Sequence, residues 1–186
     1  MNIQASQAAF PDLQELVKLF YERVEDLGRF QHVSGDEIPA VYGKLLNHNH
    51  HMTVTVESHH GCPVDVQVLD YAIEDDTYQR KILLTRQSDG RVVMFGIVRL
   101  HMHFLTEPVR AEIESRSIPL GRVLINHDVL CRVELGRLWQ VTPGADLCRH
   151  FQLHAPEITF GRTAIIHCDE EPAIELVEIV APEAAG

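Results

Sequence analysis

The chain has 186 residues, 45% of them hydrophobic, and carries 27 acidic against 16 basic side chains for a net charge of -11. This length suits a single domain over residues 1–186. The excess of acidic side chains disfavours binding to nucleic acid, because phosphates require a basic protein surface. No apolar run approaches the about 20 residues that span a bilayer, and the first residues lack a secretory signal pattern, so we expect a cytoplasmic protein with neither a nucleic-acid nor a membrane partner.

Helical periodicity dominates the first fifty residues. Apolar side chains from Leu13 to Val24 recur at helical spacing, which predicts a helix over 11–28 that Gly28 ends. A shorter helix is expected over 37–49.

The pattern then changes to alternation. Apolar residues at 52, 54 and 56 predict a strand over 52–58, and a second alternating run covers 64–73. With the turn residues between them, these runs predict a β-hairpin.

The remaining elements follow in the second half of the chain. Residues 80–86 and 92–105 predict another hairpin, with Asp89-Gly90 at its turn. Thr106 as N-cap, with a proline in the first turn, predicts a helix over 106–116. Helical character continues over 119–128, a strand is expected over 133–141, and residues 160–168 and 173–182 form a terminal hairpin. The tail from about 183 to 186 is expected to fray.

This order of elements indicates an α+β domain built on an antiparallel sheet. Strict alternation of strands and helices is missing, which argues against a doubly wound parallel sheet. The sequence also lacks a GxGxxG or GxxxxGK[ST] loop, so we expect no bound nucleotide. The four cysteines form no CxxC pair, which argues against a disulfide scaffold or a zinc ribbon.

Three charged residues stand where strands should be apolar. Glu175 and Glu178 interrupt the two apolar faces of the last strand, and Arg80 shares a face with Ile82 and Leu84. One interpretation places them at the rim of the sheet with their charged ends in water. The other is a cavity against the sheet, with an arginine and a glutamate as its polar groups.

Four segments in order resemble the chorismate pyruvate-lyase (4-hydroxybenzoate synthase) family. They are the His51-Met52-Thr53 motif after the N-terminal helices, Arg80 at the start of a strand, the Ile118–Arg122 turn (IPLGR), and the terminal hairpin that bears Glu178. The resemblance implies a single antiparallel sheet with helices on one face and an enclosed ligand. It also implies that no metal or organic cofactor is needed.

The same resemblance implies roles for individual residues. Arg80 and Glu178 would be catalytic: Arg80 would hold the ring carboxylate, and Glu178 would meet the ring hydroxyl or act as a base. Backbone N–H groups of Met52 and Leu120, together with Thr53, would complete the substrate site. Arg162 would supply a second positive charge. The implied activity is removal of pyruvate from chorismate to give a hydroxybenzoate, the 4-isomer or another.

The histidine-rich stretch departs from the family pattern and leaves two alternatives open. Five histidines lie between His48 and His60, with His101 and His103 on another expected strand. The first alternative is a non-catalytic protein of the same fold that binds an aromatic acid. The second is a metal-dependent enzyme that uses the His48–His60 cluster, although a metal needs three or four converging ligands and an extended segment would keep these apart. Product isomer and oligomeric state stay open.

Overall fold

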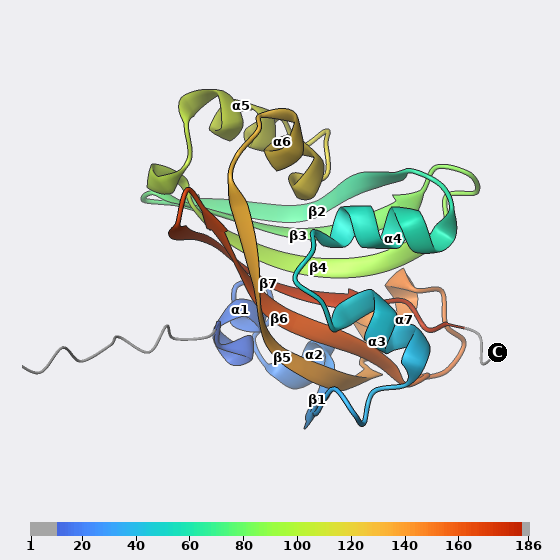
Figure 1. Ribbon diagram of the computed structural model, residues 1–186. Helices are drawn as coiled ribbons and strands as arrows, with labels where there is room; N and C mark the ends of the chain where they lie inside the picture. The colour runs from blue at the N-terminus through green and yellow to red at the C-terminus, as the bar shows by residue number, and fades with distance from the viewer. Residues whose placement is uncertain (1–10, 184–186) are drawn as a thin grey trace, which may run out of the picture.

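A computed structural model describes residues 11–183. Seven strands form one antiparallel sheet in the order β1-β5-β6-β7-β4-β3-β2 (Figure 1). The strands are β1 (Gly28–Val33), β2 (Val64–Glu74), β3 (Thr77–Arg86), β4 (Val92–His101), β5 (Cys131–Pro143), β6 (Thr159–Cys168) and β7 (Glu171–Val180). The helices are α1 (Leu13–Lys18), α2 (Val24–Leu27), α3 (Ala40–Leu46), α4 (Met52–His60), α5 (Glu107–Ser115), α6 (Leu120–Asn126) and α7 (Ala145–His150), with a 3-10 turn η1 at Met102–Phe104. The expected α+β fold on a single antiparallel sheet is confirmed.

The sheet buries both of its faces. On one face, α3 and α4 pack over one end of the strands and α5 and α6 over the other end (Figure 1). Helices were expected on this face only. The short helices α1, α2 and α7 pack on the opposite face, against a separate cluster that includes Phe95, Ile97, Val177 and Ile179. Both faces of β7 are therefore apolar because both are covered.

The hairpins expected in the second half of the chain are confirmed. Strands β3 and β4 pair antiparallel, as do β6 and β7. The expected helices around 106–116 and 119–128 are α5 and α6, with Thr106 at the N-cap position of α5 and a proline in its first turn. None of the helices over 11–183 is long and apolar enough to cross a membrane.

The expected strand over 52–58 is wrong, because these residues form helix α4. Valine and threonine favour strands locally, and the alternation matched a strand. The buried residues Met52, Thr53 and Val56, however, follow a helical spacing toward the sheet. Gly61 ends the helix in the left-handed conformation, with φ of 66°, as a helix C-terminus often does. The predicted hairpin of 52–73 is therefore absent, and β2 pairs with β3 instead.

The expected long helix over 11–28 is also wrong in its extent. These residues form two separate helices, α1 and α2. Gly28 ends α2 and is also the first residue of strand β1. The helix expected over 37–49 is shorter, because Pro39 occupies the N-cap position of α3. Strand β1 and helix α7 were not predicted. Both are six residues long and lack a strong periodic pattern.

Candidate functional site

A small cavity lies between the sheet and the N-terminal ends of α4 and α6. Its walls come from α4, α6 and the strands β3, β4, β6 and β7. The lining residues are His51, Met52, Thr53, Ile82, Leu84, Met94, Gly96, Val98, Leu120, Gly121, Ile166, Leu176 and Glu178. The cavity holds about 30 Å³, which is room for about one water molecule. The cavity therefore has no room for a ligand larger than a water molecule.

Four of the residues predicted from the sequence meet at this cavity. Met52 and Thr53 begin α4, Leu120 begins α6, and Glu178 comes from β7. The two helix ends approach closely: a Cβ added to Gly121 would lie 3.0 Å from the Thr53 hydroxyl oxygen. Backbone N–H groups in the first turn of a helix have no partner within that helix. The expected use of the Met52 and Leu120 N–H groups by a ligand stays a prediction.

Arg80 lies beside the cavity on the same face of the sheet. It stands two residues before Ile82 on β3, and its partner on β4 is Val98; both of these line the cavity. Arg80 is 0% exposed, and none of its three side-chain nitrogens has a hydrogen-bond partner among residues 11–183. The hydroxyl of the neighbouring Tyr78 is buried without a partner as well.

The unpaired guanidinium of Arg80 is electrostatically costly. Burial lowers its pKa, opposed by the nearby Tyr78 hydroxyl, yet arginine keeps its charge in proteins. A buried charge with no partner costs several kcal/mol of folding free energy. Such a group is expected where an anion completes the site.

Arg162 has a different surrounding from the one expected. Its side chain is 1% exposed, and Nε donates to Oε2 of Glu178 at 2.8 Å. The rest of the guanidinium donates to the carbonyl oxygens of His48 at 2.9 Å and His50 at 3.2 Å, with a longer contact to that of Leu46 at 3.4 Å. Arg162 therefore holds the loop between α3 and α4 against the sheet, and its donors are already engaged.

His48 completes this attachment of the loop. Its Nε2 lies 2.7 Å from the carbonyl oxygen of Leu45, and its Nδ1 accepts from the N–H of His50 at 3.1 Å. This pattern requires the neutral ring with the proton on Nε2. Burial, and then the positive charge of Arg162, lower the pKa of His48 to about 4.

Glu175 lies on the face of the sheet opposite to Glu178. It accepts from Nε of Arg99 at 2.7 Å and contacts Nε2 of His101 at 3.0 Å. Its partner across the sheet is Arg99, whereas that of Glu178 on the same strand is Gly96. Of Glu175 and Glu178, only Glu178 lines the cavity.

The sequence interpretation missed several residues of the site. His51 and Gly121 line the cavity, and Tyr78 lies beside Arg80. Tyr78 could have been predicted from the alternation in the sequence of β3, because Tyr78, Arg80 and Ile82 share one face of that strand. No pattern in the sequence pointed to Gly121 as the position where α6 meets α4.

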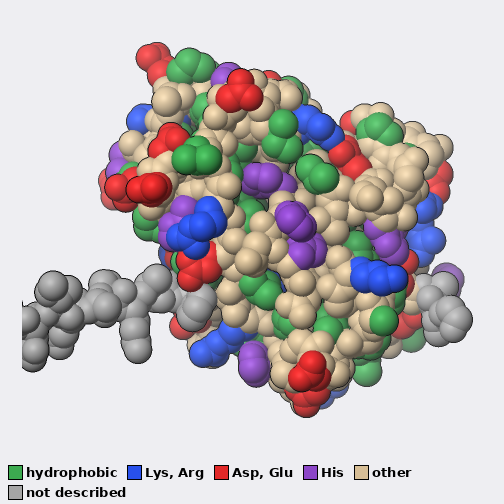
Figure 2. All heavy atoms as spheres, viewed as in Figure 1, with side chains coloured by type: hydrophobic (Ala, Val, Ile, Leu, Met, Phe, Trp, Pro, Cys, Tyr) green, Lys and Arg blue, Asp and Glu red, His purple; other side chains and the backbone are tan. Residues whose placement is uncertain are grey.

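The histidine-rich stretch does not converge on the cavity as one cluster. Figure 2 shows histidine side chains scattered over the face that carries α3 and α4. His48 and His50 stack with ring centroids 5.5 Å apart in the loop, and His59 and His60 lie at the other end of α4. His101 and His103 lie elsewhere, near Glu175 and Asp76.

A cysteine pair lies near the same loop. Cys131 of β5 and Cys168 of β6 are direct cross-strand partners, with their sulfurs 3.8 Å apart. The hydrogen bond from Cys168 lowers the pKa of Cys131 to about 6, with a further contribution from His51. This same pairing, and then burial, raise the pKa of Cys168.

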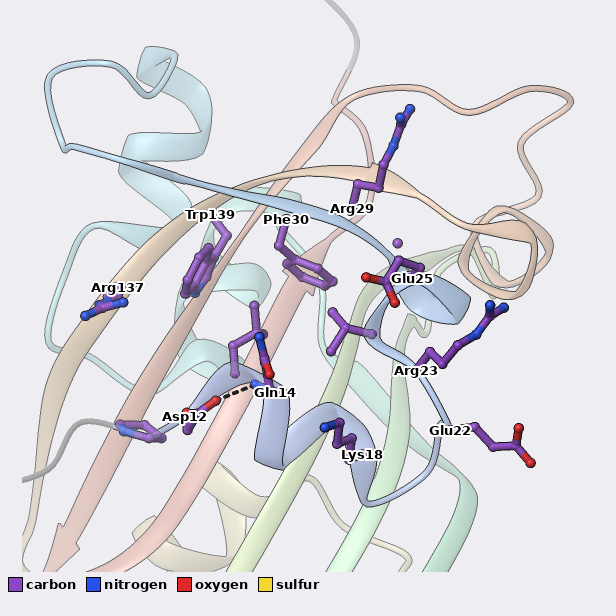
Figure 3. Close-up of a pocket in the computed structure, with 14 residues that line it drawn as sticks. Asp12, Gln14, Lys18, Glu22, Arg23, Glu25, Arg29, Phe30, Arg137 and Trp139 are labelled. Carbon is purple, nitrogen blue, oxygen red and sulfur yellow. Dashed lines mark hydrogen bonds between the residues drawn. The ribbon is translucent and has the colours of Figure 1, made fainter.

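A wider hollow in the described surface lies elsewhere. It holds about 940 Å³ between α1, α2, β1 and β5, next to residue 11, the first one described. Phe30 and Trp139 form its apolar wall, and basic and acidic side chains surround it (Figure 3). It contains none of the residues predicted to bind a ligand, and its mixed charges do not select one kind of partner.

Two of the solved structures to which the chain is similar match it with TM-scores above 0.5. The crystal structure of PhnF from Mycobacterium smegmatis matches with a TM-score of 0.55 and 13% identity, over 70% of this chain and 63% of that one. The effector domain of the same PhnF matches with a TM-score of 0.52 and 12% identity, over 73% and 90% of the two chains. The chain has the fold of this effector domain. The expected chorismate lyase-like fold is thereby confirmed.

Other comparisons are weaker. A GntR family transcriptional regulator from Bacillus cereus matches with a TM-score of 0.45. The C-terminal domain of a histidine utilization repressor from Pseudomonas syringae matches with a TM-score of 0.44. No family model matches the sequence, and no curated protein matches it. The chain spans 63% of the length of PhnF, so likeness to that protein concerns part of it only.

The predicted lyase activity on chorismate is wrong. The two structures on which the shared fold rests are the PhnF effector domain and the PhnF protein that contains it. The carboxylate of Glu178, which was expected to act as a base, accepts from Arg162 through Oε2, and its role stays a prediction. The predicted exclusion of nucleic-acid partners likewise has no support from these comparisons.

Proposed function

We propose that the chain is a non-catalytic binding domain for a small organic carboxylate, such as a hydroxylated ring acid. The observation that carries the proposal is Arg80, a fully buried guanidinium with no hydrogen-bond partner among the described residues. A carboxylate offers two oxygens in a plane, which match the paired donors of arginine. An anion beside Arg80 would remove the cost of the unpaired charge.

The surroundings of Arg80 suit such a ligand. The cavity walls are largely apolar, with Met52, Ile82 and Leu120 available to contact a ring. Glu178 and the Tyr78 hydroxyl are the polar groups that would contact a ring hydroxyl. Met52 and Thr53 open helix α4, whose N-terminal end favours negative charge. A few polar groups in an apolar cavity is the usual composition of a small-molecule site.

Binding requires the cavity to enlarge. It holds about 30 Å³, whereas sites for drug-sized molecules are about 300–1,000 Å³. The loop between α3 and α4 and the start of α6 cover it, so these segments must move when a ligand enters. Movement of a covering segment in response to a ligand is what an effector domain uses to signal, and the fold shared with the PhnF effector domain supports this analogy.

A matched pair of ligands tests the proposal. Thermal unfolding is followed with 4-hydroxybenzoate, 3-hydroxybenzoate and the corresponding neutral hydroxybenzamides. We expect saturable stabilisation by at least one acid, because a ligand that binds only the folded state raises its stability, and much less by its amide. Equal stabilisation by an acid and its amide would contradict the proposal that Arg80 binds the carboxylate of the ligand. Incubation of the protein with chorismate should release no pyruvate.

A further inference from the structure

The far end of α4 presents a second group of side chains that the proposed ligand site does not use. His59 and His60 are the last two residues of the helix, and Glu183 follows β7. Nε2 of His59 lies 3.3 Å from Oε2 of Glu183, and Nε2 of His60 lies 3.9 Å from Oε1. One ligand atom from each residue falls within 4.8 Å of the other two.

We propose that His59, His60 and Glu183 form a binding site for a divalent transition-metal ion, with zinc as the best fit and water as the fourth ligand. Zinc binds imidazole nitrogen and carboxylate oxygen at about 2.0–2.2 Å in a tetrahedral arrangement, so its ligand atoms lie roughly 3.3–3.5 Å from one another. The 3.3 Å separation of His59 and Glu183 meets this value. The 3.9 Å separation of His60 is to the other carboxylate oxygen, Oε1. The three ligand atoms lie within 4.8 Å of one another, so the side chains must move closer together to bind one ion.

The backbone holds the three residues in place. Gly61 ends α4 directly after the two histidines. The backbone N–H of Glu183 donates to the hydroxyl of Tyr42 at 2.9 Å, and Tyr42 is buried against Phe160. The two histidine rings lie edge to face, with centroids 4.7 Å apart. The site therefore needs little ordering before a metal binds.

The choice of metal follows from the donor set. Magnesium and calcium prefer sites made of oxygen ligands, whereas two imidazoles favour zinc and its neighbours in the transition series. Arg86 and Arg91 are the arginines whose positive charges act on His60. Arg86 is paired with Asp89, which reduces its repulsion of a bound cation. A bound ion would join the C-terminal end of α4 to the segment after β7, and so hold the helix whose other end covers the cavity.

Zinc titration of the full chain by calorimetry tests this site. We expect one zinc ion per chain for the wild type, and an affinity at least tenfold lower for H59A/H60A and for E183Q. Millimolar magnesium should not compete. The cobalt complex should show the intense visible absorption of a tetrahedral ion, and this band should be lost in E183Q.

The control removes the same number of histidines elsewhere. H32A/H154A replaces two exposed histidines far from the site in sequence, and should bind zinc as the wild type does. Because H59A/H60A changes a helix end, circular dichroism should confirm that it folds, and E183Q tests the site with a nearly isosteric change. Unchanged zinc affinity in both H59A/H60A and E183Q would overturn the proposal. The result of the zinc titration does not depend on whether a carboxylate binds beside Arg80.

Discussion

Arg162 and Glu178 are direct partners across strands β6 and β7, and the arginine Nε donates to the glutamate at 2.8 Å. The pair is buried, with side-chain exposures of 1% and 10%. The same guanidinium reaches the carbonyl oxygens of His48 and His50. One residue thus neutralises the carboxylate in the cavity wall and fixes the loop that covers the cavity.

The Arg162–Glu178 pair should be essential for stability. Arg162→Met leaves a buried carboxylate and several loop carbonyls without donors, and should lower the free energy of unfolding by about 3–5 kcal/mol. Urea denaturation measures this change. Arg99→Met provides the comparison, because the Arg99–Glu175 pair joins the same types of residue but is more exposed, and should cost only about 1 kcal/mol. Adding Glu178→Leu to Arg162→Met should restore part of the loss; equal losses in the two single variants would contradict this account.

Protonation of His48 should weaken the fold in mild acid. Its folded-state pKa is about 4, against 6.5 for an ordinary histidine, because burial and then Arg162 disfavour the charged ring. The unfolded chain therefore binds the proton first, so the stability contributed above pH 6.5 is lost as the pH falls from 6.5 toward 4.

The matched variants isolate this effect from the other titrating groups. Denaturation midpoints at pH 7 and pH 5 should fall more in the wild type than in His48→Gln. His154→Gln, which changes an exposed histidine, should behave as the wild type does. If wild type and His48→Gln lose stability equally between these pH values, His48 is not the buried neutral ring described here.

Cys131 should be unusually reactive for a half-buried thiol. Hydrogen bonding with Cys168, and then the contact with His51, lower its pKa to about 6, and the thiolate is the reactive form. The rate of iodoacetamide alkylation at Cys131, read by mass spectrometry, should rise with a midpoint near pH 6. Cys168→Ala should move that midpoint upward. A midpoint at the ordinary value of about 8.5 in the wild type would refute the pairing.

Local patterns in the sequence determined the hairpins but not the cover of the cavity. The turn at Asp89-Gly90 and the alternation around it identified β3 and β4, because both signals are local. Helix α4 was mistaken for a strand because valine and threonine favour strands, while its packing against the sheet depends on distant residues. The bonds of Arg162 to the loop join positions 112 to 116 residues apart, and no local pattern reports them.

The candidate site shows the same division. Arg80 and Glu178 were recognised because a charge in an apolar strand is visible in the sequence. Their surroundings were not: the alternation gave no sign that Arg162 would engage Glu178, or that Arg80 would have no partner among the described residues. This difference between two buried arginines on one sheet face is the reason that we propose Arg80, and not Arg162, as the group that binds a ligand.

The most direct test of the central claim is the thermal stability of the wild type and Arg80→Met, each with and without a hydroxybenzoate that stabilises the wild type. Methionine fills a similar space without a charge. Without ligand, Arg80→Met should be as stable as the wild type or more stable by about 1–4 kcal/mol, as when buried charges give way to apolar side chains. The hydroxybenzoate should then raise the melting temperature of the wild type only. A less stable Arg80→Met that still gains the full ligand-induced shift would contradict the assignment of Arg80 as the carboxylate-binding residue.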